Sequence, residues 1–187
     1  MSIFTSSREK RLWLCVLLVI VAIYLTLFLG QPLAELFESQ DFRAAIFLLV
    51  MLLIGATILI HAIKTKPSKT EITFILGIIA VYVMFTLRLG MPERSHLMEY
   101  SILAIFIHQA INERLRNGKQ IPLPALISFI LTFIIGVIDE YIQFFLPNRV
   151  FDPEDIVFNG MAAVVALGSY AVILWIRKYK NKPKLNR

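Results

Sequence analysis

The sequence has little charge and almost no cysteine. Charged residues make up 17% of its 187 positions and hydrophobic residues 58%, whereas a soluble globular domain is about one quarter charged and about half apolar. Its single cysteine, Cys15, excludes an intramolecular disulfide and a cysteine-ligated zinc cluster. Gly-x-Ser-x-Gly and a glycine-rich phosphate loop are also absent, so the sequence contains neither a hydrolase nucleophile motif nor a nucleotide-binding motif. The low charge and the high apolar content favour an integral membrane protein.

Long apolar runs occupy most of the chain. A helix needs about 20 mostly apolar residues to cross about 30 Å of hydrocarbon. Six runs of this kind predict an all-α polytopic membrane protein, a six-transmembrane-helix bundle that forms a single membrane domain over residues 1–187. The six runs cover residues 11–30, 43–63, 71–89, 96–113, 122–146 and 156–176. The fourth run is the weakest, because it contains Glu99, His108 and Gln109.

Lysine and arginine are concentrated at alternate connections between these runs. They cluster at the N-terminus, after the second and fourth runs, and in a basic tail over residues 177–187, while the segment 31–42 is acidic. By the positive-inside rule this pattern predicts a multi-pass protein of the cell membrane with cytoplasmic N- and C-termini. It also requires the fourth run to cross the membrane. The net charge of +6 is then explained by topology signals and lipid contacts, and no nucleic-acid partner is expected.

Polar residues are predicted to gather at the outer ends of the last three runs. His96 and Tyr100 are four residues apart at the start of the fourth run and therefore share a helix face. Asp139 and Glu140 lie about 26 Å along the fifth run, at 1.5 Å per residue, which is near the outer edge of the hydrocarbon. The sixth run begins beside Asp155. Ionisable residues at such positions are functional candidates by default.

Two spaced motifs run through this region. In the first, a basic residue opens a helix and is followed by a histidine and an aromatic residue. Its members are Arg94, His96 and Tyr100. In the second, a glutamate and a glutamine three residues later precede a Pro-x-Arg turn, an aspartate and an asparagine. Its members are Glu140, Gln143, Pro147, Arg149, Asp155 and Asn159. On these motifs the chain resembles the VanZ-like family of teicoplanin-resistance-associated membrane proteins.

The resemblance covers a core of about residues 72–176 and leaves the first two runs outside it. The family pattern continues after the asparagine with spaced small glycines, where this chain has Gly160, Ala162 and Ala166. Alanine still permits close approach of helices. The resemblance implies a protein of the bacterial cell envelope connected with glycopeptide antibiotics. It does not imply a particular reaction or ligand-binding mechanism.

The residues suggest an anion-binding pocket at the extracytoplasmic surface. Guanidinium groups bind carboxylate or phosphate bidentately, so Arg94 and Arg149 are expected to anchor an anionic group. Carboxylates beside a histidine and a glutamine suit proton transfer where burial adjusts their pKa. The hypothesis is that the chain binds or modifies an anionic lipid-linked or peptidoglycan-related ligand, or a glycopeptide. Membrane lipids surround it, and it is expected to contribute to teicoplanin resistance. The candidate catalytic residues are Glu140, Glu99 and Asp155, and the candidate ligand-binding residues are Arg94, His96, Tyr100, Asp139, Gln143, Arg149 and Asn159.

Other readings of the same residues stay open, including whether any reaction is catalysed. In one alternative, the arginines and carboxylates only form ion pairs that lock helices together. In another, the protein binds a ligand or membrane partner without catalysis. A small proton-coupled transporter would need polar residues further inward, and the two histidines there, His61 and His108, fit interfacial helix ends better. A metal site is a weaker alternative, because one histidine among scattered carboxylates is a weak signature. No metal and no cofactor are therefore expected. The metal-site alternative would use His96, Glu99, Asp139 and Glu140.

Overall fold

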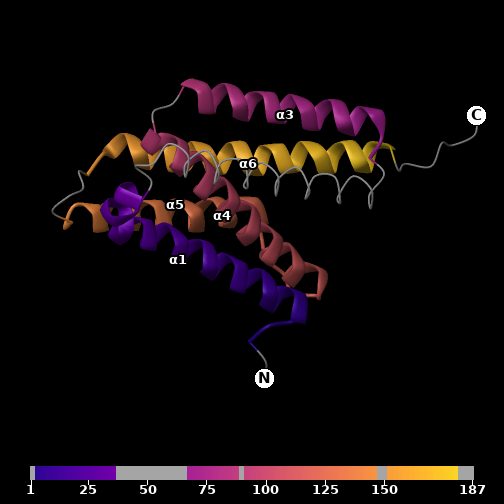
Figure 1. Ribbon diagram of the computed structural model, residues 1–187. Coiled ribbons are helices and arrows are strands. Elements are labelled where there is room, and N and C mark those ends of the chain that lie inside the picture. Colours follow the sequence, from indigo (N-terminus) through magenta and orange to yellow (C-terminus); the bar gives the residue numbers. More distant parts are fainter. Residues whose placement is uncertain (1–2, 37–66, 89–90, 147–150, 181–187) are drawn as a thin grey trace, which may run out of the picture.

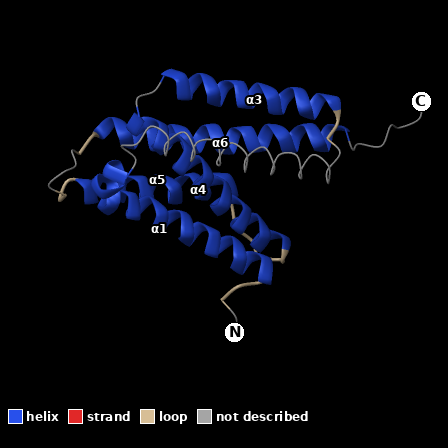
Figure 2. Ribbon diagram, in the orientation of Figure 1, coloured by secondary structure: helices blue, strands red, loops and turns tan. Residues whose placement is uncertain are grey.

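The computed structural model describes residues 3–36, 67–88, 91–146 and 151–180, with the backbone alone at 29–36, 86, 91–95 and 180. Within these ranges all regular structure is helical, which confirms the predicted all-α fold (Figures 1 and 2). The predicted run 43–63 lies outside the described residues. The described helices are α1 (Ser7–Leu36), α3 (Lys69–Arg88), α4 (Met91–Arg116), α5 (Pro124–Gln143) and α6 (Pro153–Lys180).

Three of the described helices are long and apolar enough to cross a membrane. These candidate spans are Ser7–Phe28 in α1, Pro124–Gln143 in α5 and Pro153–Tyr179 in α6. Each exposes large apolar side chains, such as Phe28 on α1 and Val157 on α6, as a lipid-facing helix does. The chain is therefore built as a membrane protein.

Helix α4 lies at the centre of the bundle and packs against α1, α5 and α6, while α3 packs against α6 (Figure 1). Its Leu97, Leu103 and Ile107 are almost fully buried. This position explains why α4 is the least apolar of the predicted spans: its polar side chains face neighbouring helices instead of lipid. The helix is also longer than the predicted run 96–113, because it begins at Met91 and ends at Arg116.

Small residues allow α4, α5 and α6 to approach closely. Ala162 and Ala166 on α6 are buried, as is Ala104 on α4. A Cβ added at Gly160 would lie only 3.2 Å from Cδ2 of Phe133 on α5. The stretch where the VanZ-like pattern has spaced glycines thus still serves as a packing surface in this chain.

Contacts between helix ends define two ends of the bundle. The start of α1 meets the end of α4, where Ser6 Oγ donates to Glu113 Oε1 at 3.1 Å. The start of α3 meets the end of α6, where Arg177 Nε donates to Glu71 Oε1 at 2.8 Å. We call this the basic end. At the opposite end, called the site end, α5 finishes and α4 and α6 begin (Figure 1).

The basic end contains a buried ion pair that the sequence analysis missed. The Glu9 carboxylate is fully buried and lies 2.8 Å from Nε of Arg114. It also accepts hydrogen bonds from the backbone N–H and the hydroxyl of Thr5, both at 2.6 Å. Ser6 Oγ accepts the Glu9 N–H at 3.0 Å. The sequence signals only the local contacts, because a serine three residues before a glutamate at the start of an apolar run is typical of a capping box. It does not indicate that Arg114 is the partner.

Candidate functional site

Seven of the ten side chains predicted to form a site come together at the site end. We call them the polar cluster, which takes residues from α4, α5 and α6. Its members are His96, Tyr100, Asp139, Glu140, Gln143, Asp155 and Asn159. All but Asp155 are buried, and Tyr100, Glu140 and Asn159 have no exposed surface at all. Separate parts of the sequence therefore share one buried polar region.

Tyr100 joins α4 to α5. Its hydroxyl donates a hydrogen bond to Oδ2 of Asp139 at 2.9 Å, inside the protein. The predicted helix face is also present, because the His96 and Tyr100 rings stack with their centroids 6.0 Å apart. A hydrogen bond to a charged group contributes about 1.5–3 kcal/mol, so this contact fixes the Asp139 carboxylate.

His96 joins α4 to α6, where its Nε2 lies 3.6 Å from Oδ2 of Asp155. Asp155 is held in the first turn of α6 by local sequence. Asp152 precedes Pro153, the first residue of the helix, and its Oδ1 accepts the Glu154 N–H at 2.8 Å. An aspartate cap, a proline at the first helical position and acidic residues in the first turn all favour a helix start here.

Glu140 and Gln143 form a pair on α5, as their three-residue spacing predicts. Gln143 Nε2 donates to Oε1 of Glu140 at 3.0 Å, and both side chains are buried. The second carboxylate oxygen of Glu140, Oε2, has no hydrogen-bond partner among the described residues, and neither has Nδ1 of His96. Leaving a buried polar atom without a partner costs about 1–3 kcal/mol. The cluster thus contains two buried polar atoms that lower stability and that a ligand could bind.

Gly136 brings Asn159 and Tyr100 against α5, a role that the sequence analysis did not assign. A Cβ at this position would lie 3.0 Å from Cβ of Asn159 and 3.2 Å from Cε1 of Tyr100. The Asn159 amide is fully buried, and both of its polar atoms are without a hydrogen bond within the described ranges. The only signal in the sequence was a glycine one turn before Asp139 and Glu140 in an otherwise apolar helix.

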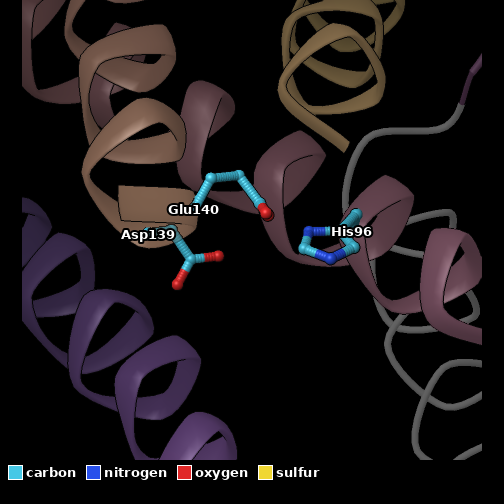
Figure 3. A group of neighbouring side chains, drawn as sticks. All are labelled: His96, Asp139 and Glu140. Carbon is cyan, nitrogen blue, oxygen red and sulfur yellow. The ribbon is translucent and has the colours of Figure 1, made fainter. Parts of the chain in front are cut away.

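Three members of the cluster come close enough to share a ligand. One donor atom from each of His96, Asp139 and Glu140 lies within 4.8 Å of the other two. Figure 3 shows the Glu140 carboxylate reaching toward the His96 ring, with the Asp139 carboxylate beside it. Such a group of one imidazole and two carboxylates can exchange protons with a bound molecule or coordinate a cation.

The structure describes only part of the remaining predicted residues. Glu99 is partly buried on α4. Arg94 belongs to the first turn of α4, but its side chain lies outside the described residues, as does all of Arg149. Their role as anion anchors stays a prediction.

Away from the polar cluster, α4 has a second buried polar contact and a cavity. His108 is buried, and its Nδ1 lies 3.1 Å from Oγ of Ser128 on α5. His108 thus lies close to the start of α5, where α5 and α6 cover it, and its position at the membrane interface stays a prediction; His61 lies outside the described residues. A cavity of about 560 Å³ opens between α3, α4 and α6 and is lined mostly by apolar side chains such as Ile78, Ile102 and Ile173.

The chain was compared with known protein families. The VanZ/LLP1 family model matches residues 14–175. The match contains the whole polar cluster and begins upstream of the core over 72–176 on which the sequence motifs carried the resemblance. No curated protein and no solved structure matches the chain.

Proposed function

Because the chain belongs to the VanZ/LLP1 family, we propose that it is an envelope membrane protein that binds or modifies an anionic lipid-linked or peptidoglycan-related ligand. The site is the polar cluster. One observation carries the proposal: buried acidic, amide and imidazole side chains from three helices meet at one end of the bundle. Placing such groups inside a membrane protein costs free energy, and they therefore mark functional sites by default.

The proposed topology places this site on the extracytoplasmic side of the cell membrane. Arg8, Arg114 and Arg177 all lie at the basic end, where α1 begins and α4 and α6 finish. The positive-inside rule assigns that end to the cytoplasm. Six spans, cytoplasmic termini and an outward-facing site end then follow as parts of the same proposal.

The anionic nature of the ligand is argued from two arginines. Arg94 is two residues before His96 in the first turn of α4, and Arg149 belongs to the connection between α5 and α6. That connection joins the helix turns that carry Gln143 and Asp155. Guanidinium groups there suit a phosphate or carboxylate at the mouth of the site.

In a catalytic version of this function, Glu140 accepts or donates the proton and Glu99 and Asp155 assist. Oε1 of Glu140 accepts a hydrogen bond from Gln143 at 3.0 Å, while Oε2 of Glu140 makes no hydrogen bond to any described residue. Gln143 and Asn159 would orient the ligand, together with Asp139, His96 and Tyr100. The cavity between α3, α4 and α6 has mostly apolar walls, which suits hydrocarbon better than a hydrated ion path. This supports a lipid-linked ligand over the alternative of a small proton-coupled transporter.

A deletion strain tests the proposal. Teicoplanin susceptibility and the envelope-lipid profile are measured without the protein and after complementation with the wild-type chain, Glu140→Gln, Arg149→Gln or Glu154→Gln. Glu154 is an exposed acidic residue in the first turn of α6 and serves as the matched control. We expect the wild-type chain and Glu154→Gln to restore the profile and the other two variants to fail. Unchanged susceptibility and lipids in the deletion strain would rule the proposal out.

The same variants separate catalysis from binding alone. Some lipid species will change in amount in the deletion strain. If Glu140→Gln is expressed normally and binds such a species but does not restore the lipid profile, Glu140 has a chemical role. If Glu140→Gln restores the profile fully, the protein acts as a non-catalytic binding protein, and Arg149→Gln remains the variant that should fail.

A further inference from the structure

We propose that His96, Asp139 and Glu140 form a binding site for a divalent transition-metal ion of the zinc or manganese class. The three candidate donor atoms lie within 4.8 Å of one another. Metal–ligand distances of about 2 Å place the ligands of one ion within about 4 Å of each other. Side-chain rotations that move the donor atoms by about 1 Å would therefore complete the coordination, without movement of the helices. This inference goes beyond the proposed ligand and does not depend on it.

Burial distinguishes this group from an ordinary acidic patch. The exposed fractions of His96, Asp139 and Glu140 are 8%, 1% and 0%. Two neighbouring carboxylates removed from water are stabilised by a cation between them, because charge is costly in a low-dielectric interior unless it is paired or coordinated. Nδ1 of His96 and Oε2 of Glu140, both buried, have no hydrogen-bond partner in the described part of the chain. These two atoms are available as ligands.

Each candidate ligand also has an outer partner on its other side. Tyr100 donates to Oδ2 of Asp139 at 2.9 Å, and Gln143 donates to Oε1 of Glu140 at 3.0 Å. Asp155 Oδ2 lies 3.6 Å from Nε2 of His96. Metal-binding histidines and carboxylates characteristically have such outer partners, which orient the ligand and fix the histidine tautomer. Here they hold each side chain by one of its polar atoms.

The chemistry of the three donor atoms indicates which class of metal ion the site would bind. One imidazole nitrogen with two carboxylate oxygens suits zinc or manganese better than magnesium or calcium, which prefer oxygen donors alone. Three protein ligands leave a coordination position for water or for an oxygen of a bound anion. The sequence alone disfavoured a metal because it could not show that Asp139 and Glu140 fold against His96.

Metal binding to the purified full-length chain tests the site. The protein, free of any polyhistidine tag, is reconstituted in lipid nanodiscs, stripped with a chelator, and titrated with Zn²⁺ and with Mn²⁺ separately. Elemental analysis after dialysis gives the stoichiometry and calorimetry gives the affinity. We expect one ion per chain for at least one of the metals. His96→Gln should weaken its binding at least tenfold, and Tyr100→Phe, which removes an outer partner, about tenfold.

His108→Gln is the matched control, because His108 is a buried histidine on the same helix outside the polar cluster. Its metal binding should equal that of the wild-type chain. If His96→Gln does not give monodisperse protein, Glu140→Gln replaces it with the same expected loss. The site is disproved if the wild-type chain retains neither metal, or if the ligand variant binds as tightly as His108→Gln. Either result leaves the complementation test of the proposed function standing.

Discussion

At the basic end of the bundle, one buried and one partly buried acidic side chain each lie against an arginine. Glu9 lies 2.8 Å from the Arg114 guanidinium, and Glu71 lies 2.8 Å from that of Arg177. At the site end, the buried carboxylates of Asp139 and Glu140 accept hydrogen bonds from the neutral side chains of Tyr100 and Gln143. The two ends bury similar residue types but surround them differently.

This difference indicates what each end is for. Ion pairs and helix caps at the basic end join the start of α1 to the end of α4 and the start of α3 to the end of α6, which is a structural role. The site end keeps buried atoms of Glu140, His96 and Asn159 without hydrogen bonds to the described residues, at a cost to stability. Proteins retain such an arrangement where function depends on it. Substitutions at the two ends should therefore separate stability from function.

The largest loss of stability is expected from Arg114→Ala. Removing this arginine leaves the fully buried Glu9 carboxylate without its cation, which costs about 3 kcal/mol. Thermal unfolding in detergent micelles measures the loss. Arg116→Ala, at an exposed arginine two residues further on, removes the same charge and should have little effect. Equal falls for the two variants would mean that the Glu9–Arg114 pair does not hold the basic end together.

Gly136→Ala should have the next largest effect and acts at the site end. The added Cβ would lie 3.0 Å from Cβ of Asn159 and 3.2 Å from Cε1 of Tyr100, and overpacking of this kind costs about 1–3 kcal/mol. Gly168→Ala on α6 is the control, since nothing lies within 4 Å of its added Cβ. That control should be neutral or stabilising by about 0.5 kcal/mol. Chemical denaturation of both variants gives the comparison, and a stable Gly136→Ala would contradict close packing at the site.

Tyr100→Phe should cost about 1–2 kcal/mol, because it leaves the buried Asp139 carboxylate with one donor fewer. Unfolding of the chelator-treated protein isolates this effect from any contribution of a bound ion. Tyr141→Phe, at an exposed tyrosine on α5, should leave the unfolding free energy within about 0.5 kcal/mol of the wild-type value. If both variants behave alike, the hydrogen bond from α4 to α5 does not contribute to stability.

The smallest effect is expected for Arg177→Ala. Its partner Glu71 keeps 12% of its side chain exposed, whereas Glu9 is fully buried, although the two arginine side chains are exposed to a similar extent, 37% for Arg177 and 35% for Arg114. Water therefore screens the pair, and its loss should cost about 0.5 kcal/mol. Lys178→Ala provides the exposed control on the next residue. A loss as large as that of Arg114→Ala would show that burial does not decide which ion pairs stabilise the basic end.

Local spacing in the sequence predicted the parts of the site that lie within one helix. The shared face of His96 and Tyr100 and the pairing of Glu140 with Gln143 both follow from helical periodicity, and the structure confirms them. The all-helical fold followed from the apolar runs in the same way.

Contacts between helices could not be predicted from the sequence. The approach of His96 to Asp155 depends on how α4 packs against α6, and the role of Gly136 depends on which side chains face it. The burial of His108 has the same origin, because α4 became the central helix and was covered by α5 and α6. Periodicity assigns a residue to a helix face, and only packing decides what that face meets.

The melting temperature of chelator-treated Glu140→Gln, relative to the wild-type chain, tests most directly whether the site end is kept for function at a cost to stability. Glutamine preserves the shape of Glu140 and can still accept the Gln143 hydrogen bond, while it removes an ionisable group from a fully buried position. We predict a melting temperature equal to or above that of the wild-type chain. A fall as large as that caused by Arg114→Ala would contradict this account and make Glu140 a structural residue.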